Sequence, residues 1–95
     1  MTIFYSDWQM TSELTFEAAH RVADGWEYDW RVSWLPQRLL TRAQALAGME
    51  LAEIFSGNHY QRDVILAARA IASAGELGIA VEEAMAVLEG RRRNR

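Results

Sequence analysis

The chain contains no cysteine and no lysine, and Pro36 is its single proline. Without cysteine there is no disulfide, no zinc–thiolate site and no thiol nucleophile. The N-terminus lacks a basic stretch followed by an apolar core, so we expect no secretory signal. No apolar run approaches the ~18–20 residues that a membrane helix needs. These absences predict a cytoplasmic protein with no membrane partner.

The composition is that of an ordinary globular protein, with 51% hydrophobic and 24% charged residues. Ninety-five residues are enough for one domain, which we take as residues 1–95. Residues 1–11 are either an N-terminal extension or an edge strand of the fold. The formal net charge is −3, and residues 91–95 form an arginine-rich tail.

Two stretches alternate between apolar and polar residues, at positions 14–22 and 26–34, as strands do. A two-residue turn at Asp24 and Gly25 would put Phe16 and Val22 on the polar face. A three-residue loop at 23–25 matches both faces, so we predict that register. It pairs Val22 with Trp26, His20 with Tyr28, Ala18 with Trp30, Phe16 with Val32 and Leu14 with Trp34. On the other face it pairs Arg21 with Glu27, Glu17 with Arg31 and Thr15 with Ser33.

The second half of the chain predicts helices. Pro36 ends the strand, and Thr41 with Gln44 forms a capping box for a helix over 42–55 that stops at Gly57. Asn58 and Gln61 repeat this pattern for a helix over 59–74 that stops at Gly75, and a third helix covers 81–89 and stops at Gly90. The predicted fold class is α+β: an antiparallel β-hairpin packed on about three α-helices. If residues 3–8 add a strand, the hairpin becomes a three-stranded meander.

The strand and helix around Pro36 carry a recognisable motif. Residues 30–45 read WRVSWLPQRLLTRAQA, and the similarity continues to Glu53. This stretch resembles small uncharacterised proteins of actinobacteria and their phages, with the pattern W-x-V-x-W-L-P-x-R-x-L-T-R-x-Q-A. Gln37 stands where those proteins often have glycine. The resemblance implies such a source and a strand–turn–helix unit, and it transfers no catalytic residue.

The residues that carry chemistry are sparse. His20 and His59 are far apart and lack metal-ligand spacing, and we expect both to be structural. Glu50 and Glu53 lie one helical turn apart, but they are expected to be solvated. No nucleophile elbow, phosphate-binding loop or dinucleotide fingerprint is present. We therefore predict a non-enzyme with no catalytic residue, metal site, cofactor or small-molecule substrate.

A helix-turn-helix is a further interpretation of the C-terminal half. With Gly78 as the turn glycine, the positions that must be small or apolar are occupied by Ala74, Leu77, Ile79, Ala84 and Val87. The recognition helix would then present Glu82 and Glu83 outward. DNA binding depends on cations that meet phosphates, so an acidic helix is repelled. We expect no DNA reading by this helix.

The helix over 42–55 is apolar around nearly its whole circumference. It is either the central helix of the fold or partly a subunit interface. We therefore interpret the chain as a protein–protein interaction module, with a homodimer as one form, of the kind a phage or mobile element supplies as an accessory protein. The interface residues we predict are Leu46, Met49, Ile54, Phe55, Trp30 and Trp34. The alternative is a small nucleic-acid-binding regulator that uses Arg91, Arg92, Arg93 and Arg95.

Overall fold

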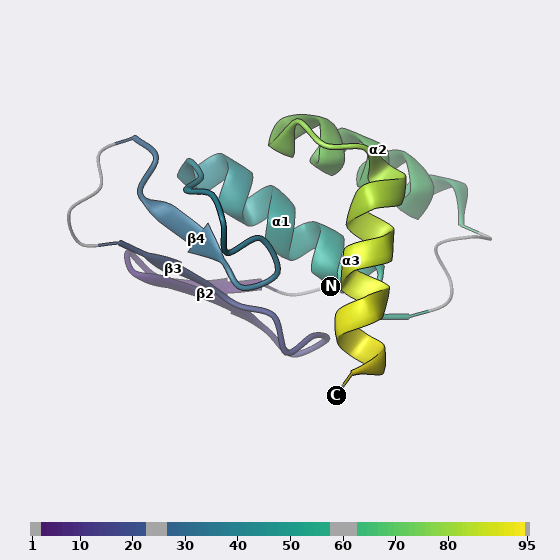
Figure 1. The fold of residues 1–95 in the computed structure, drawn as a ribbon, viewed down its shortest axis with the longest axis horizontal. Helices are drawn as coiled ribbons and strands as arrows, with labels where there is room; N and C mark the ends of the chain where they lie inside the picture. The colour runs from purple at the N-terminus through teal and green to yellow at the C-terminus, as the bar shows by residue number, and fades with distance from the viewer. Residues whose placement is uncertain (1–2, 23–26, 58–62, 95) are drawn as a thin grey trace.

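The computed structural model describes residues 3–22, 27–57 and 63–94. In these ranges the chain forms an antiparallel sheet of four strands followed by three helices (Figure 1). The strands are β1 (Ile3–Tyr5), β2 (Gln9–Ser12), β3 (Ala19–Arg21) and β4 (Trp30–Val32), and the helices are α1 (Arg42–Ile54), α2 (Val64–Leu77) and α3 (Val81–Arg93). The predicted α+β class is confirmed.

The sheet is a meander in the order β1-β2-β3-β4. Residues 3–12 supply its first two strands, with Phe4 opposite Thr11. Met10 on β2 pairs with Ala19 and is buried in the core. The N-terminal residues 3–12 therefore contribute both an edge strand and a core side chain.

The predicted hairpin register is wrong. In the structure β3 pairs with β4 through Ala19–Val32, His20–Arg31 and Arg21–Trp30. An odd slip in register exchanges the two faces of a strand, so Ala19 rather than His20 faces the core. The physical reason is the third strand, because Ala19 lies between Met10 and Val32 in one buried row. The predicted loop at 23–25 lies outside the described residues.

The predicted partners along 14–18 change with the register. Leu14 and Phe16 precede β3 and are exposed, so neither pairs with Trp34 or Val32. Arg21 forms its ion pair with Asp29, at 2.6 Å between Nε and Oδ2, rather than with Glu27. Ser33 contacts Ala18 and Glu17 instead of Thr15. The segment between β2 and β3 thus serves as a connection that packs against other elements.

Helix α1 begins where the capping box predicts. Thr41 Oγ1 accepts from the Gln44 N–H, and Gln44 Oε1 accepts from the Thr41 N–H. The helix crosses the sheet closely at Gly48, whose carbonyl accepts from Trp34 Nε1 at 3.1 Å. An added Cβ at Gly48 would lie 3.2 Å from Val32 Cγ2. The glycine is needed here for the close approach of helix and strand.

Helix α2 differs from its prediction at both ends. It is capped by Asp63, whose Oδ1 accepts from the Ile65 and Leu66 N–H groups, and the predicted start at 58–62 lies outside the described residues. The helix runs through Gly75 and ends at Gly78, which has φ +74. A left-handed residue at this position suits glycine, so Gly78 and not Gly75 is the stop signal.

The C-terminal end of α2 is held by one side chain from the first turn of α1 and one from the segment before α1. Arg38 Nη2 donates to the Leu77 carbonyl at 2.8 Å, and Gln44 Nε2 donates to the Glu76 carbonyl at 3.2 Å. The last carbonyls of a helix have no partner within the helix, so these donors satisfy them. They fix the end of α2 against the start of α1.

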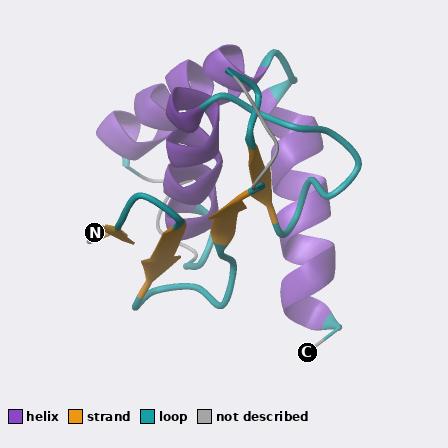
Figure 2. Cartoon of the chain, turned by 90° about the vertical axis from the view of Figure 1, so that its left-hand side faces the viewer, coloured by secondary structure: helices purple, strands orange, loops and turns teal. Residues whose placement is uncertain are grey.

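The prediction that the third helix stops at Gly90 is wrong, because α3 continues to Arg93. Figure 2 shows it along one side of the molecule, at a steep angle to the other helices. Glu82 and Glu83 lie in its first turn and Arg91, Arg92 and Arg93 in its last. Both sets complement the helix dipole, which favours acids at the N-terminus and bases at the C-terminus. The arginine-rich tail is therefore largely the last turn of a helix.

Candidate protein-docking surface

The residues predicted as a partner interface are mostly inside the molecule. Trp30, Trp34, Met49, Ile54 and Phe55 are all buried in the hydrophobic core. Leu46 is half-buried and packs against that core. The chain itself covers the surfaces of these five residues, so the structure places them in the core rather than on an exposed surface.

The reason is the central position of α1. Its sides contact β2 and β4 of the sheet and helix α2 (Figure 1). A helix that is apolar all round needs cover on every side, and here one chain provides it. Of the two alternatives for this helix, the structure shows the central one.

The helix with an uncovered apolar face is α2. Its inner side places Ala70, Ser73, Ala74 and Leu77 in the interior. Its outer side exposes 82% of Val64, 71% of Ile65 and 62% of Ile71. The α2 outer face, as we define it, consists of exposed apolar residues only: Val64, Ile65, Ala67, Ala68, Ile71, Ala72 and Gly75.

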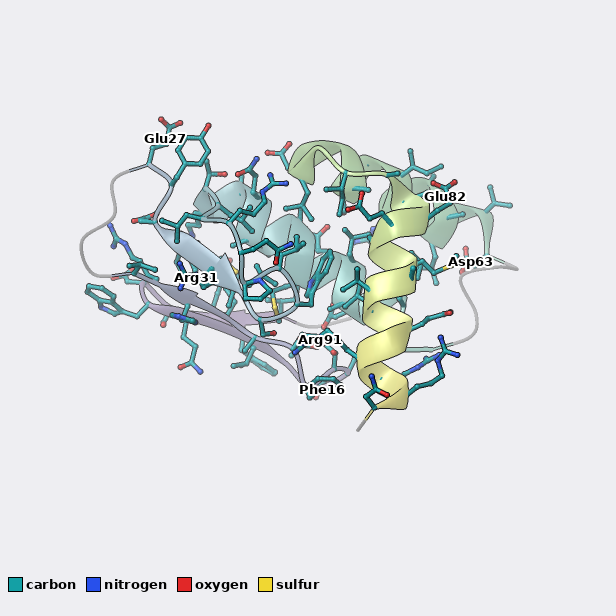
Figure 3. All side chains as sticks on the ribbon, viewed as in Figure 1. Phe16, Glu27, Arg31, Asp63, Glu82 and Arg91 are labelled. Atoms are coloured by element: carbon teal, nitrogen blue, oxygen red, sulfur yellow. The ribbon has the colours of Figure 1, made fainter. Side chains whose placement is uncertain are left out.

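These residues form one continuous stripe. Positions 64, 68, 71 and 75 are spaced by three or four, so they share a helix face, and 65 and 72 lie beside them. Arg69 and Glu76 are the only charged residues within α2, and both lie along the same edge of the stripe. Figure 3 shows side chains of α2 projecting away from the rest of the molecule. The α2 outer face is therefore apolar with one charged border.

A groove adjoins the other edge of the stripe. Its volume is about 320 Å³. Its walls are mainly apolar and come from α2, α3 and the end of α1, and they include Ala67, Ile71, Val81 and Met85. Contiguous exposed apolar surface on a small protein commonly marks an interaction site. The groove extends the α2 outer face toward α3.

The arginines predicted as a nucleic-acid contact are partly engaged within the chain. Arg91 Nε donates to Glu17 Oε2 at 2.7 Å. Arg92 Nη1 donates to the carbonyls of Phe55 and Ser56, at 3.3 and 3.1 Å. Arg93 is exposed, and Arg95 lies outside the described residues. The cluster therefore offers fewer free cations than the sequence suggests.

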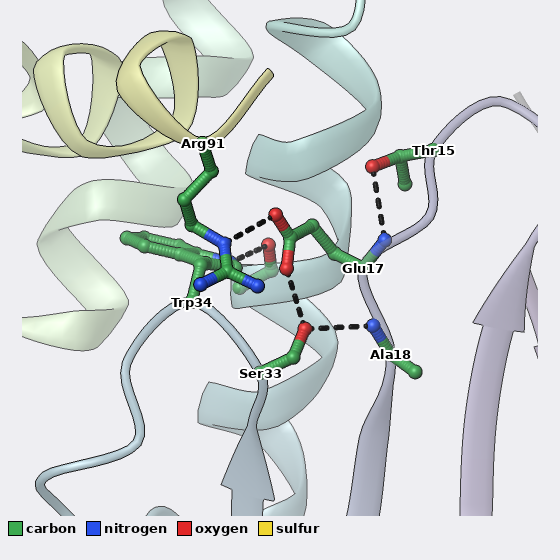
Figure 4. A network of polar contacts seen from close by, with 7 residues as sticks. Thr15, Glu17, Ala18, Ser33, Trp34 and Arg91 are labelled. Carbon is green, nitrogen blue, oxygen red and sulfur yellow. Dashed lines mark hydrogen bonds and ion pairs between the residues drawn. The ribbon is translucent and has the colours of Figure 1, made fainter. Parts of the chain in front are cut away.

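Glu17 is the centre of a buried polar network (Figure 4). Its Oε1 accepts from Ser33 Oγ at 2.5 Å, its Oε2 accepts from Arg91, and its N–H donates to Thr15 Oγ1 at 3.2 Å. Ser33 Oγ also accepts from the Ala18 N–H at 2.9 Å. Each carboxylate oxygen of Glu17 thus accepts a hydrogen bond. The network joins the segment before β3, the residue after β4 and helix α3, and the role that its geometry supports is structural.

A hollow of about 380 Å³ lies beside this network, lined in part by Glu13, Phe16, Ser56 and Arg92. Nearby, Ser12 Oγ donates to Glu53 Oε2 at 2.5 Å, so the buried Glu53 carboxylate also has a donor.

Among the described residues, no group of three or more histidines or acids could hold a metal ion. His20 is exposed and lies opposite Gln9 and Arg31 on the sheet, so its predicted pairing with Tyr28 is wrong. His59 lies outside the described residues.

Exposed aromatic rings gather at one end of the sheet. Tyr5 and Trp8 are both largely exposed. The guanidinium of Arg42 lies 5.4 Å from the centre of the Tyr5 ring, and that of Arg21 lies 5.3 Å from the Trp8 ring. Such cation–π contacts attract the guanidinium groups to the ring faces and stabilise the exposed rings in place. The Tyr5 and Trp8 rings therefore already have contacts within the chain, so we choose the α2 outer face rather than this end of the sheet as the docking surface.

Helices α2 and α3 are arranged as a helix-turn-helix requires. They are joined by residues 78–80 and bend by 98°, and the motif commonly shows 90–120°. Ala74, Leu77 and Ala84 are buried as the pattern demands, whereas Val87 is exposed. Glu82 and Glu83 are exposed at the start of α3, as expected. The shape is present, and the acidic surface of the second helix opposes phosphate contact.

Comparisons with protein-family models, with curated proteins and with solved structures gave no match to this chain. In the described parts of the chain, no single helix is long and apolar enough to cross a membrane. Helices α2 and α3 together reach that length and composition, but they form a sharply bent pair.

The α2 outer face was missed by the sequence analysis, although a signal for it exists. Residues 64–75 contain a single charge, Arg69. A helix over 64–77 with so little charge is apolar on two opposite sides, and only one of them can face α1. The predicted helix had other bounds, 59–74, and the predicted interface lay on the helix over 42–55. The apolar outer side of residues 64–75 was therefore not predicted.

Proposed function

We propose that this protein is a non-catalytic protein–protein interaction module that docks through the α2 outer face. The observation that carries the proposal is the exposure of Val64, Ile65 and Ile71 on one side of a helix whose other side is in the core. Full burial of such a side chain is worth about 1.5–3 kcal/mol. Three of them on one stripe favour a partner that covers all three.

The partner's surface must itself be apolar and elongated. The α2 outer face runs along a helix of 14 residues and has no charge in its centre, so it suits another helix packed along it. Arg69 and Glu76 at one border would fix the orientation of that helix through opposite charges. Binding of nucleic acid through the arginine cluster has less support, because Arg91 and Arg92 already contact acceptors of the chain.

The cellular setting belongs to the same proposal. We place the module in the cytoplasm, on the sequence features described above. A role as an accessory protein of a phage or mobile element rests on the resemblance of residues 30–53 alone.

The proposal is tested by site-specific photo-crosslinking in the native cell. A photo-reactive residue is placed at Ala68 in the middle of the α2 outer face, and at Ala86, an exposed alanine of α3, as the matched control. We expect a discrete protein adduct at position 68 and none of the same mass at position 86. Absence of any discrete adduct at position 68, or the same adduct from both positions, would overturn the proposal.

A further inference from the structure

We infer that the partner on the α2 outer face is a second copy of this chain, with the two α2 helices antiparallel about a two-fold axis between Ala72 and Ser73. This inference rests on the proposed function, and it deepens it by naming the occupant. It is carried by the positions of the two charges on α2.

Arg69 and Glu76 are seven residues apart along one border of the stripe. Two helical turns separate them, which is about 10.5 Å along the axis. A two-fold axis perpendicular to antiparallel helices keeps each border on its own side and reverses the direction along the helix. Arg69 of each copy therefore meets Glu76 of the other, and the two ion pairs form at once. The charged border is complementary to itself, which a two-fold interface requires.

Helix α2 ends at Leu77, so only positions 68–77 of the two copies pair residue for residue. Ile65 and Val64, the most exposed of the apolar side chains, extend past that end toward residues 78–80 of the other copy, where its chain bends by 98° into α3. Near the axis Ala72 contacts its own copy, and its small side chain lets the two helices approach closely.

The contact between the two helices is small. With the axis between positions 72 and 73, the two helices overlap over residues 68–77, which is about 15 Å of helix, so the shared surface lies at the small end of specific interfaces. We therefore expect a weak dimer, with a dissociation constant of about 1–100 μM. Measurements must span that range of concentration.

The test uses charge reversal at the two positions, followed by sedimentation equilibrium of the full chain. Arg69→Glu places glutamates opposite each other in both pairs, and Glu76→Arg places arginines opposite each other. Each single variant should dimerise at least about tenfold more weakly than the parent. An equimolar mixture of the two variants should associate more strongly than either alone, because every facing pair is then opposite in charge.

Exposed charges elsewhere provide the control. Glu83→Arg and Arg93→Glu on α3 alter the net charge by the same amounts, and they should leave dimerisation unchanged. Thermal unfolding of each variant verifies that the fold is kept. Failure of the mixture to associate more strongly than the single variants would overturn the inferred pairing.

The failure of this inference is distinguishable from the failure of the proposed function. A second copy predicts that the adduct at position 68 has twice the mass of the 10.8 kDa chain. A monomer at about 1 mM with a discrete adduct of another mass overturns the second copy and leaves the docking face intact. A monomer with no discrete adduct overturns both.

Discussion

Arg91 and Glu17 join the last turn of α3 to the segment between β2 and β3, with 2.7 Å between Nε and Oε2. The Glu17 side chain is 1% exposed, and the Arg91 side chain is 37% exposed. The guanidinium also lies 5.8 Å from the centre of the Phe16 ring. The end of the chain is thereby tied to the sheet, and an arginine that looks like a free cation in the sequence is a structural residue.

Replacing Arg91 by alanine should lower the free energy of unfolding by about 1–3 kcal/mol, because it leaves a buried carboxylate with fewer donors. Urea denaturation measures the change. Arg93→Ala, an exposed arginine of the same helical turn, is the control and should stay within about 0.5 kcal/mol of the parent. Equal stability of the two variants would show that the ion pair with Glu17 contributes nothing.

Gly48→Glu should unfold the protein or lower its stability by about 4 kcal/mol or more. The new side chain would start 3.2 Å from Val32 Cγ2 and carry an unpaired charge into the core. The control is Gly75→Ala on α2, where an added Cβ meets nothing within 4 Å. That change should stabilise by about 0.4–1 kcal/mol, since alanine favours the helix. Circular dichroism during thermal unfolding separates the two outcomes.

Trp30→Ala should destabilise the protein by about 3–5 kcal/mol, because its side chain is buried in the hydrophobic core. Trp8 offers a control of the same residue type, since its ring is largely exposed. Trp8→Ala removes mainly the contact with Arg21, and we expect a loss of about 0.5–1 kcal/mol. A denaturation midpoint of Trp30→Ala near that of the parent would contradict the buried position.

Replacing Glu82 and Glu83 together by glutamine should leave any weak DNA binding unchanged or slightly stronger. The two acids repel phosphates, so their loss cannot remove a favourable contact. Fluorescence anisotropy with duplex DNA at several salt concentrations measures the effect. A loss of specific binding on this change would instead establish α3 as a recognition helix.

Local signals in the sequence predicted local structure well. The capping box at Thr41 and Gln44 placed the start of α1 at the correct residue, and the α+β class followed from alternation and helical spacing. The hairpin register failed because it was judged from two strands, whereas Met10 of a third strand selects Ala19 for the core. Contacts between distant segments decide such cases, and one pair of strands does not contain them.

The same limit applies to the candidate site. The apolar circumference of the helix over 42–55 was read correctly, but its cover comes from the sheet and α2 together. Because the sheet and α2 cover the sides of α1, the exposed apolar surface lies on the outer side of α2 instead. Residue patterns show how much apolar surface a helix has, and only the assembled fold shows which part of it stays exposed.

The two donors at the C-terminal end of α2 imply uneven dynamics along that helix. Arg38 and Gln44 hold the carbonyls of Leu77 and Glu76, whereas the first turn carries the exposed Val64 and Ile65. Local opening of a helix is easiest where few buried contacts resist it. Amide hydrogens near the start of α2 should therefore exchange with solvent faster than those near its end. A partner that binds along α2 would slow exchange most at the end that is fastest in the free protein.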